Sequence, residues 1–174
     1  MSDTLITIIA IFLAAVLMFV FPLMAVSSNQ EDVAQLAVTE ATQEFVNKAA
    51  TKGKITQDDY DAYVQTLGAT GNTYDIKIEV QHLDENPGKK TSATSGDMVG
   101  ENVRYSSFTD EILKGIEDNN GTYSLSKGDN VIVTVNNTNT TLAQLLRNFM
   151  YKVTGSDTYQ IGASASALVV SNGK

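Results

Sequence analysis

The feature that most limits how this chain can fold is an uncharged segment close to its start. No charged side chain lies between Asp3 and Glu31, and the 22 residues from Leu5 to Val26 are almost all apolar. As a helix this segment would be about 33 Å long, against about 30 Å for the hydrocarbon core of a bilayer. The segment therefore predicts a membrane-spanning helix.

A secretion signal that is later removed is the alternative interpretation. The triplet Ala25-Val26-Ser27 has the small side chains of a cleavage site. A removable signal, however, normally has a basic start and an apolar core of about 7 to 15 residues. No Lys or Arg precedes Lys48. We therefore expect the segment to stay attached, with the acidic remainder of the chain on the extracytoplasmic side.

Helical periodicity continues beyond the apolar segment. The pattern places on one face the apolar residues Val33, Leu36, Ala37, Ala41 and Phe45, with Glu31 outside this face. Pro22 removes one backbone hydrogen bond and should bend the helix rather than end it. We expect one kinked helix of about 45 residues that ends near Gly53, the alternative being two helices separated by a break at residues 27–29.

The rest of the chain alternates between strand and helix patterns. Period-two alternation and β-branched runs predict strands at residues 73–83, 103–108, 122–125, 131–135 and 159–170, with 131–135 as a central strand. Capping residues predict helices that start at Thr56, at Thr109 and at Thr140 or Thr141. The last of these, which runs to Gly155, should pack on the sheet through its apolar stripe. The small residues of the strand at 159–170 should let another backbone approach it closely.

This pattern predicts an α+β fold with two parts. Residues 1–53 form the transmembrane or assembly helix with its amphipathic continuation, and residues 54–174 form an extracytoplasmic head. The head should contain about four mainly antiparallel strands and two or three short helices. Residues 84–102 have too little apolar surface to order themselves and are predicted to be a mobile loop.

The composition argues against several classes of function. A net charge of -8 makes nucleic acid an unsuitable partner, and the absence of cysteine excludes thiolate metal sites and disulfides. His82 is the single histidine, and the chain has no nucleophile motif to go with it, so we read it as an exposed residue at a strand end and expect neither an enzyme nor a cofactor. The acidic residues Asp58, Asp59 and Asp61 suit a helix N-terminus without a metal. Glycosylation sequons begin at Asn120, Asn136 and Asn139, a number that chance explains.

The arrangement of residues 3–50 resembles that of the type IV pilin superfamily. The likeness lies in the short polar start, the uncharged helix of about twenty residues with Pro22 towards its end, and the amphipathic continuation into a β-rich head. The Ala- and Ser-rich C-terminal strand is similar to that of minor pilins or pilin-like proteins of the tight-adherence branch. Members of this superfamily are held in the membrane as monomers and then assemble into filaments through their apolar helices.

The resemblance implies which residues make the assembly contacts. In that family an acidic residue near the N-terminus neutralises the α-amine of a neighbouring subunit. The matching position here, Leu5, is apolar, so Asp3 is the residue to which the resemblance assigns this role. The assembly residues that it implies are Asp3, Leu5, Ile9, Phe12, Val16, Phe19, Pro22 and Leu23.

We therefore expect a structural subunit that contacts membrane lipid first and copies of itself later, in a surface filament or a membrane-associated complex. The alternative is a monomeric, membrane-anchored binding or adaptor domain, in which the helix only tethers the head. A tether tolerates any apolar sequence, whereas an assembly helix depends on particular positions such as Asp3 and Pro22.

Overall fold

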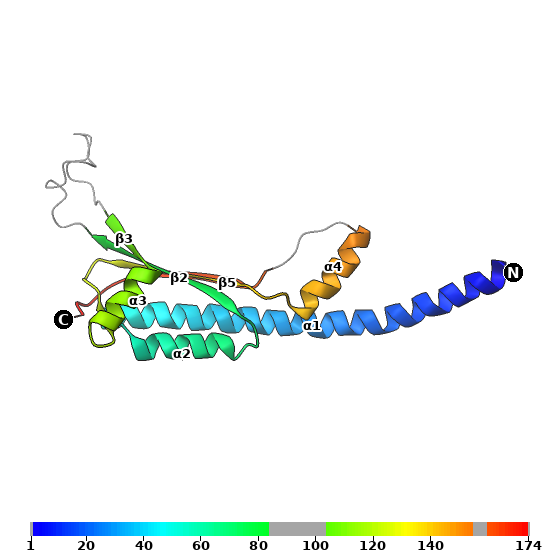
Figure 1. Cartoon of the computed structure of the whole chain (residues 1–174), viewed down its shortest axis with the longest axis horizontal. Helices are drawn as coiled ribbons and strands as arrows, with labels where there is room; N and C mark the ends of the chain where they lie inside the picture. Colours follow the sequence, from blue (N-terminus) through cyan, green and yellow to red (C-terminus); the bar gives the residue numbers. More distant parts are fainter. Residues whose placement is uncertain (1, 84–103, 155–159, 174) are drawn as a thin grey trace, which may run out of the picture.

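The computed structural model describes residues 2–83, 104–154 and 160–173. Within these ranges it confirms the α+β class: a long N-terminal helix carries a small head of antiparallel strands and three short helices (Figure 1). The predicted mobile loop, residues 84–102, lies outside the described residues. In chain order the elements are α1 Ser2–Lys52, β1 Lys54–Thr56, α2 Gln57–Gly68, β2 Tyr74–Leu83, β3 Arg104–Phe108, α3 Thr109–Asp118, β4 Thr122–Ser124, β5 Asn130–Asn137, α4 Leu142–Thr154 and β6 Gly162–Leu168.

α1 is one unbroken helix of 51 residues. The prediction of a single long helix is thus confirmed, and the alternative of a break at residues 27–29 is wrong. Pro22 lies inside the helix, and Figure 1 shows α1 curving along its N-terminal half. The helix ends where Gly53 adopts a φ of +67°, a left-handed conformation that costs glycine no steric strain. Continuous helix, with no flexible linker, therefore joins the apolar segment to the head.

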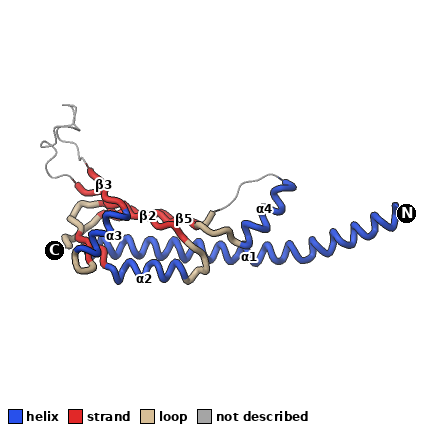
Figure 2. Tube along the Cα trace, viewed as in Figure 1, coloured by secondary structure: helices blue, strands red, loops and turns tan. Residues whose placement is uncertain are grey.

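The main sheet has four antiparallel strands in the order β3-β2-β5-β6. Val80 of β2 lies opposite Val131 of β5, and Val133 of β5 lies opposite Ala165 of β6. The prediction of a central strand at residues 131–135 is therefore confirmed. The C-terminal half of α1 runs along one face of this sheet, and α2 lies on the far side of α1 (Figure 2).

α1 packs closely on β6 because the inward side chains of this strand are small. Ala165 is buried there, with Ala163 and Ala167 packed against the same core. The side-chain amide of Gln35 donates to the carbonyl oxygen of Gly162 at 2.6 Å and accepts from its amide nitrogen at 3.0 Å. The predicted close approach of another backbone to this strand is thus the approach of α1.

The face of α1 that packs against the head differs from the predicted face. Val33 and Leu36, which were assigned to it, are exposed, whereas Phe45 is buried as expected. The buried row consists of Ser27, Glu31, Ala34, Val38, Thr42, Phe45 and Ala49. Steps of three and four residues place this whole row on one side of a helix. Apolar periodicity alone missed it, because Ser27, Glu31 and Thr42 are polar.

A second, two-stranded sheet closes the end of the head. β1 pairs with β4, and Ile55 of β1 is fully buried opposite Tyr123. β1 was not predicted, because three residues carry too little periodicity to identify a strand. Directly after it, the hydroxyl of Thr56 accepts from the backbone amide of Asp59 at 3.2 Å, which confirms Thr56 as the N-cap of α2.

The cap predicted for α3 is wrong by one residue. The hydroxyl of Thr109 bonds to β2 instead, since it accepts from the amide of Ile78 at 2.8 Å and donates to the carbonyl of the same residue at 3.3 Å. Phe108 takes the cap position, and its amide donates to the carboxylate of Glu111 at 3.3 Å. A threonine that anchors a helix to a distant strand cannot be told from a capping threonine by local sequence.

The prediction that α4 packs on the sheet is also wrong. α4 instead contacts α1 and then slants away from it, towards the N-terminal end of the molecule (Figure 1). Leu142 and Leu145 of its apolar stripe remain about half exposed. The space over this face of the sheet is already occupied by α1, which a pattern within residues 142–154 could not reveal.

Candidate assembly surface

The first half of α1 presents an apolar surface that the other described parts of the chain leave uncovered. Among the described residues, α1 is the one helix long and apolar enough to cross a membrane, and its most apolar window has no buried residue. The side chains assigned to assembly point outwards all around it: Asp3, Leu5, Ile9, Phe12, Phe19, Pro22 and Leu23 are exposed, and Val16 is partly covered. The structure therefore spreads these residues around one helix rather than gathering them into a pocket.

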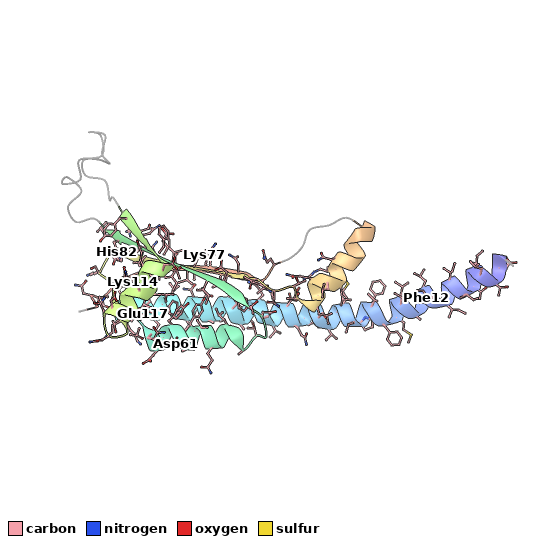
Figure 3. The ribbon with its side chains drawn as sticks, in the orientation of Figure 1. Phe12, Asp61, Lys77, His82, Lys114 and Glu117 are labelled. Carbon is pink, nitrogen blue, oxygen red and sulfur yellow. The ribbon has the colours of Figure 1, made fainter. Side chains whose placement is uncertain are left out.

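One row on this helix continues from the apolar segment into the head. Phe12, Phe19, Val26 and Val33 recur every seven residues, and their exposed fractions are 70%, 74%, 56% and 69%. A spacing of seven leaves consecutive members within about 20° of each other around the helix axis. Figure 3 shows Phe12 projecting away from the ribbon. We call Phe12, Phe19, Val26 and Val33 the heptad row.

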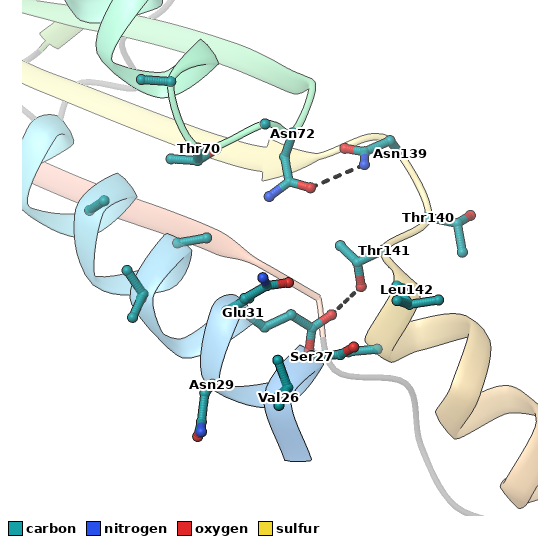
Figure 4. Close-up of a pocket in the computed structure, with 17 residues that line it drawn as sticks. Val26, Ser27, Asn29, Glu31, Thr70, Asn72, Asn139, Thr140, Thr141 and Leu142 are labelled. Carbon is teal, nitrogen blue, oxygen red and sulfur yellow. Dashed lines mark hydrogen bonds between the residues drawn. The ribbon is translucent and has the colours of Figure 1, made fainter. Parts of the chain in front are cut away.

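A groove of about 840 Å³ lies at the end of the heptad row nearest the head. The chain segments 69–72 and 139–143 form its walls (Figure 4). On the α1 side it is lined by four apolar and four polar residues: Val26, Val33, Ala34, Ala37, Ser27, Asn29, Gln30 and Glu31. Across the mouth, the side chain of Asn139 donates to that of Asn72 at 3.1 Å. The heptad row thus leads into a groove that both apolar and polar side chains line.

A buried acidic residue holds the wall of this groove to α1. Glu31 is 4% exposed and accepts a hydrogen bond from the hydroxyl of Thr141 (Figure 4). It accepts another from the guanidinium of Arg147. A carboxylate can be buried at tolerable cost when a cation and hydrogen-bond donors surround it. Its partners lie more than a hundred residues further along the chain, so local sequence analysis could not identify this site.

The first turn of α4 is fixed by hydrogen bonds that support this contact. The hydroxyl of Thr141 accepts from the amide of Gln144 at 3.1 Å, and the side-chain oxygen of Gln144 accepts from the amide of Thr141 at 3.1 Å. This is a capping box, which fixes the first turn of a helix. Of the two caps predicted, Thr140 or Thr141, the structure selects Thr141. The cap places Arg147 within reach of Glu31.

His82, which the sequence suggested was an exposed residue, is mostly enclosed near the far end of the head (Figure 3). Its Nδ1 lies 2.9 Å from a carboxylate oxygen of Asp129, and its Nε2 lies 3.1 Å from the hydroxyl of Tyr123. Asp129 is 2% exposed and also accepts from the backbone amides of Ser126 and Leu83. This network satisfies the hydrogen-bonding needs of a buried aspartate and ties β2 to the turn before β5.

The acidic residues at the start of α2 take part in protein contacts. Asp59 accepts from Lys48 at 2.8 Å and from Lys52 at 2.9 Å, which ties α2 to α1. Burial raises the pKa of Asp59, but the hydrogen bonds from Lys48, Lys52 and Thr56 outweigh it and lower this pKa to about 2. Among the described residues, no group of three or more potential ligands is arranged to hold a metal ion.

The chain was compared with known proteins in three ways. No family model, no curated protein and no solved structure matched it.

Proposed function

We propose that this protein is a structural, pilin-like subunit that is anchored by residues 3–26 and assembles through α1 with copies of itself. The head then lies outside the cytoplasm, on the membrane or on a surface filament. The heptad row is the observation that carries this proposal, because its exposed apolar side chains extend beyond the segment that a membrane would cover.

The position of Val33 favours self-assembly over a simple tether. At 1.5 Å per residue it lies about 10 Å beyond Val26, the last residue of the apolar segment. A tethering helix needs no apolar surface there, yet Val33 is 69% exposed and Leu36 nearby is 59% exposed. Large apolar side chains aligned with an apolar segment are typical of a surface that another chain covers.

The rigidity of α1 supports the same proposal. The buried row that holds α1 in the head and the exposed heptad row belong to one continuous helix. A contact made between the apolar segments of two copies would therefore fix the relative positions of their heads. A regular filament requires this property, whereas a tether does not.

Asp3 is proposed to provide the polar contact at the start of the helix. It lies in the first turn of α1 and is exposed. Its backbone carbonyl accepts from the hydroxyl of Thr7 at 2.8 Å, so its carboxylate is not needed for that contact. In an apolar surrounding, pairing this carboxylate with a neighbour's amine would strongly favour one axial register.

A positive charge introduced into the heptad row tests the proposal. Val33→Arg in the full chain should reduce assembled material recovered by shearing from cells, as seen by electron microscopy and immunoblotting, and should leave membrane-bound monomer unchanged. The matched control is Val170→Arg, a valine that is 61% exposed elsewhere on the head. Normal assembly of Val33→Arg would contradict the proposal.

Asp3→Ala gives a second, independent test. We expect less assembled protein and an unchanged amount of membrane-bound monomer, because the carboxylate is not part of the folded core. Unchanged assembly would remove the docking role of Asp3, and an equal fall of both species would indicate a folding defect instead.

The groove favours one other candidate, a monomeric membrane-anchored binding domain. Its volume of about 840 Å³ is in the range of small-molecule sites, and its walls offer polar groups to a ligand. This candidate predicts that the protein purified in detergent stays monomeric and that cells yield no sheared filaments. The proposed structural role predicts the opposite result.

A further inference from the structure

α4 has an apolar face that the described part of the protein leaves uncovered. The side of α4 that touches α1 carries Ala143, which is 1% exposed, and Arg147, which is paired with Glu31. Leu142 and Leu145 lie on another side and are 50% and 56% exposed.

α4 is attached where the apolar segment of α1 ends. Its anchoring residues Thr141 and Arg147 bind Glu31, which lies five residues after Val26. From this point α4 slants towards the N-terminal end of the molecule (Figure 1). When residues 5–26 cross a bilayer, α4 therefore lies at the level of the membrane surface.

The composition of α4 suits such a position. It contains no acidic residue, in a chain whose net charge is -8, and of its two basic residues, Arg147 and Lys152, the first is paired with Glu31. Helices that lie in the plane of a membrane surface combine an apolar face with a polar face that carries basic and few acidic residues. Acidic side chains would be repelled by anionic lipid headgroups.

We propose that α4 is a membrane-surface helix, whose Leu142 and Leu145 insert between the headgroups and acyl chains of the bilayer that α1 spans. The proposal rests on the anchoring of α1 in the proposed function and adds a second lipid contact, made by the head itself. A single spanning helix leaves its head free to rotate about the helix axis. Two contacts, held together by the Glu31–Arg147 pair, would hold the head in one orientation.

Tryptophan fluorescence can test this proposal because the chain contains no Trp. The full-length variants Leu145→Trp and Leu142→Trp each introduce one reporter at a half-exposed position of α4. They would be reconstituted in vesicles of phosphatidylcholine and phosphatidylglycerol that contain lipids with a nitroxide either near the headgroup or near the end of the acyl chain. Val170→Trp, at the opposite end of the head, is the control, and Phe12→Trp reports on the spanning segment.

We expect both α4 reporters to be quenched more by the shallow nitroxide than by the deep one. Phe12→Trp should be quenched by the deep nitroxide, and Val170→Trp by neither. Circular dichroism would verify that each variant is folded, and the use of two reporters protects against a local defect at one of them.

Two outcomes would overturn the proposal while leaving the anchor intact. In the first, Phe12→Trp is quenched but both α4 reporters behave like Val170→Trp. In the second, the emission of the α4 reporters responds to the ratio of protein to lipid rather than to the nitroxides, which would mean that a second copy of the chain covers α4. Absence of quenching at Phe12→Trp would overturn both the anchor and the membrane-surface position of α4.

Discussion

Glu31 of α1 and Arg147 of α4 form an ion pair although 116 residues separate them in the chain. Their side chains are 4% and 13% exposed. Because α4 does not pack on the sheet, this pair and the hydrogen bond from Thr141 are central to its attachment. The position of α4 thus depends on this polar contact as well as on the packing of Ala143, which is 1% exposed.

Replacement of Glu31 should therefore release α4. Glu31→Gln leaves Arg147 without its carboxylate, and losing one partner of a buried pair costs about 3 kcal/mol. We expect faster hydrogen exchange at the backbone amides of residues 142–154, with little change in the sheet. Glu40→Gln, an exposed carboxylate on the same helix, is the control. Equal protection of α4 in both variants would show that the pair does not hold it.

The ion pairs of Asp59 should make stability depend on acid pH. The pKa of Asp59 is lowered from 3.8 to about 2 in the folded protein, so its contribution is present above about pH 4 and is lost as the pH falls to about 2. Because Lys48 and Lys52 are partly exposed, solvent screening reduces this contribution to about 1 kcal/mol. Asp59→Asn should lose that part of the pH dependence in unfolding experiments in detergent. If the free energies of unfolding of Asp59→Asn and of the unaltered protein differed by the same amount at every pH, the prediction would be wrong.

Tyr63 should ionise well above the usual pH range of a tyrosine. Its ring stacks on Phe45 with centroids 4.6 Å apart, and its hydroxyl lies 2.9 Å from that of Thr42. The Thr42 hydroxyl donates to the carbonyl of Val38 at 2.6 Å, so Tyr63 is the donor between the two hydroxyls. Burial raises the pKa of Tyr63 to about 12.

An absorbance titration of the phenolate groups measures this effect. Tyr63→Phe should remove one group that titrates near pH 12 and lower stability by about 1 kcal/mol, because one buried hydrogen bond is lost and the ring packing is kept. The raised pKa means that the stability that Tyr63 contributes is present below about pH 10 and is lost as the pH rises towards 12. Loss of an early-titrating group instead would place Tyr63 at the surface.

Two glycines offer a matched test of the backbone at helix ends. Gly53 has a positive φ, and a Cβ there would lie 2.3 Å from the carbonyl oxygen of Ser171. Gly53→Ala should therefore destabilise the protein by about 2 kcal/mol and loosen the C-terminal segment. A Cβ at Gly68 meets nothing within 4 Å, so Gly68→Ala should stabilise α2 by about 0.5 kcal/mol. Thermal unfolding of both variants measures the two changes in stability. Equal changes for Gly53→Ala and Gly68→Ala would contradict the prediction.

The features that sequence analysis predicted are those that depend on neighbours in the chain. The continuity of α1, the alternation in β2 and β5, and the cap at Thr56 follow from local periodicity and local hydrogen bonding, and the structure confirms them. The small side chains around Ala165 also predicted close packing correctly.

The features that were missed depend on partners far away in the chain. Glu31 was placed off the packing face of α1 because a charge normally avoids it, and only Arg147 explains its burial. His82 was assigned to the surface because Asp129 could not be foreseen as its partner. α4 was placed on the sheet because its stripe is apolar, whereas α1 already covers that face.

The unbroken course of α1 also has a mechanical consequence. A pull on the head would pass along the backbone of a single helix into the apolar segment. Hydrogen bonds between successive turns resist such tension everywhere except at Pro22, which has no amide hydrogen to donate. Under force the rod would therefore yield first at Pro22 and lengthen there, while the head stayed folded.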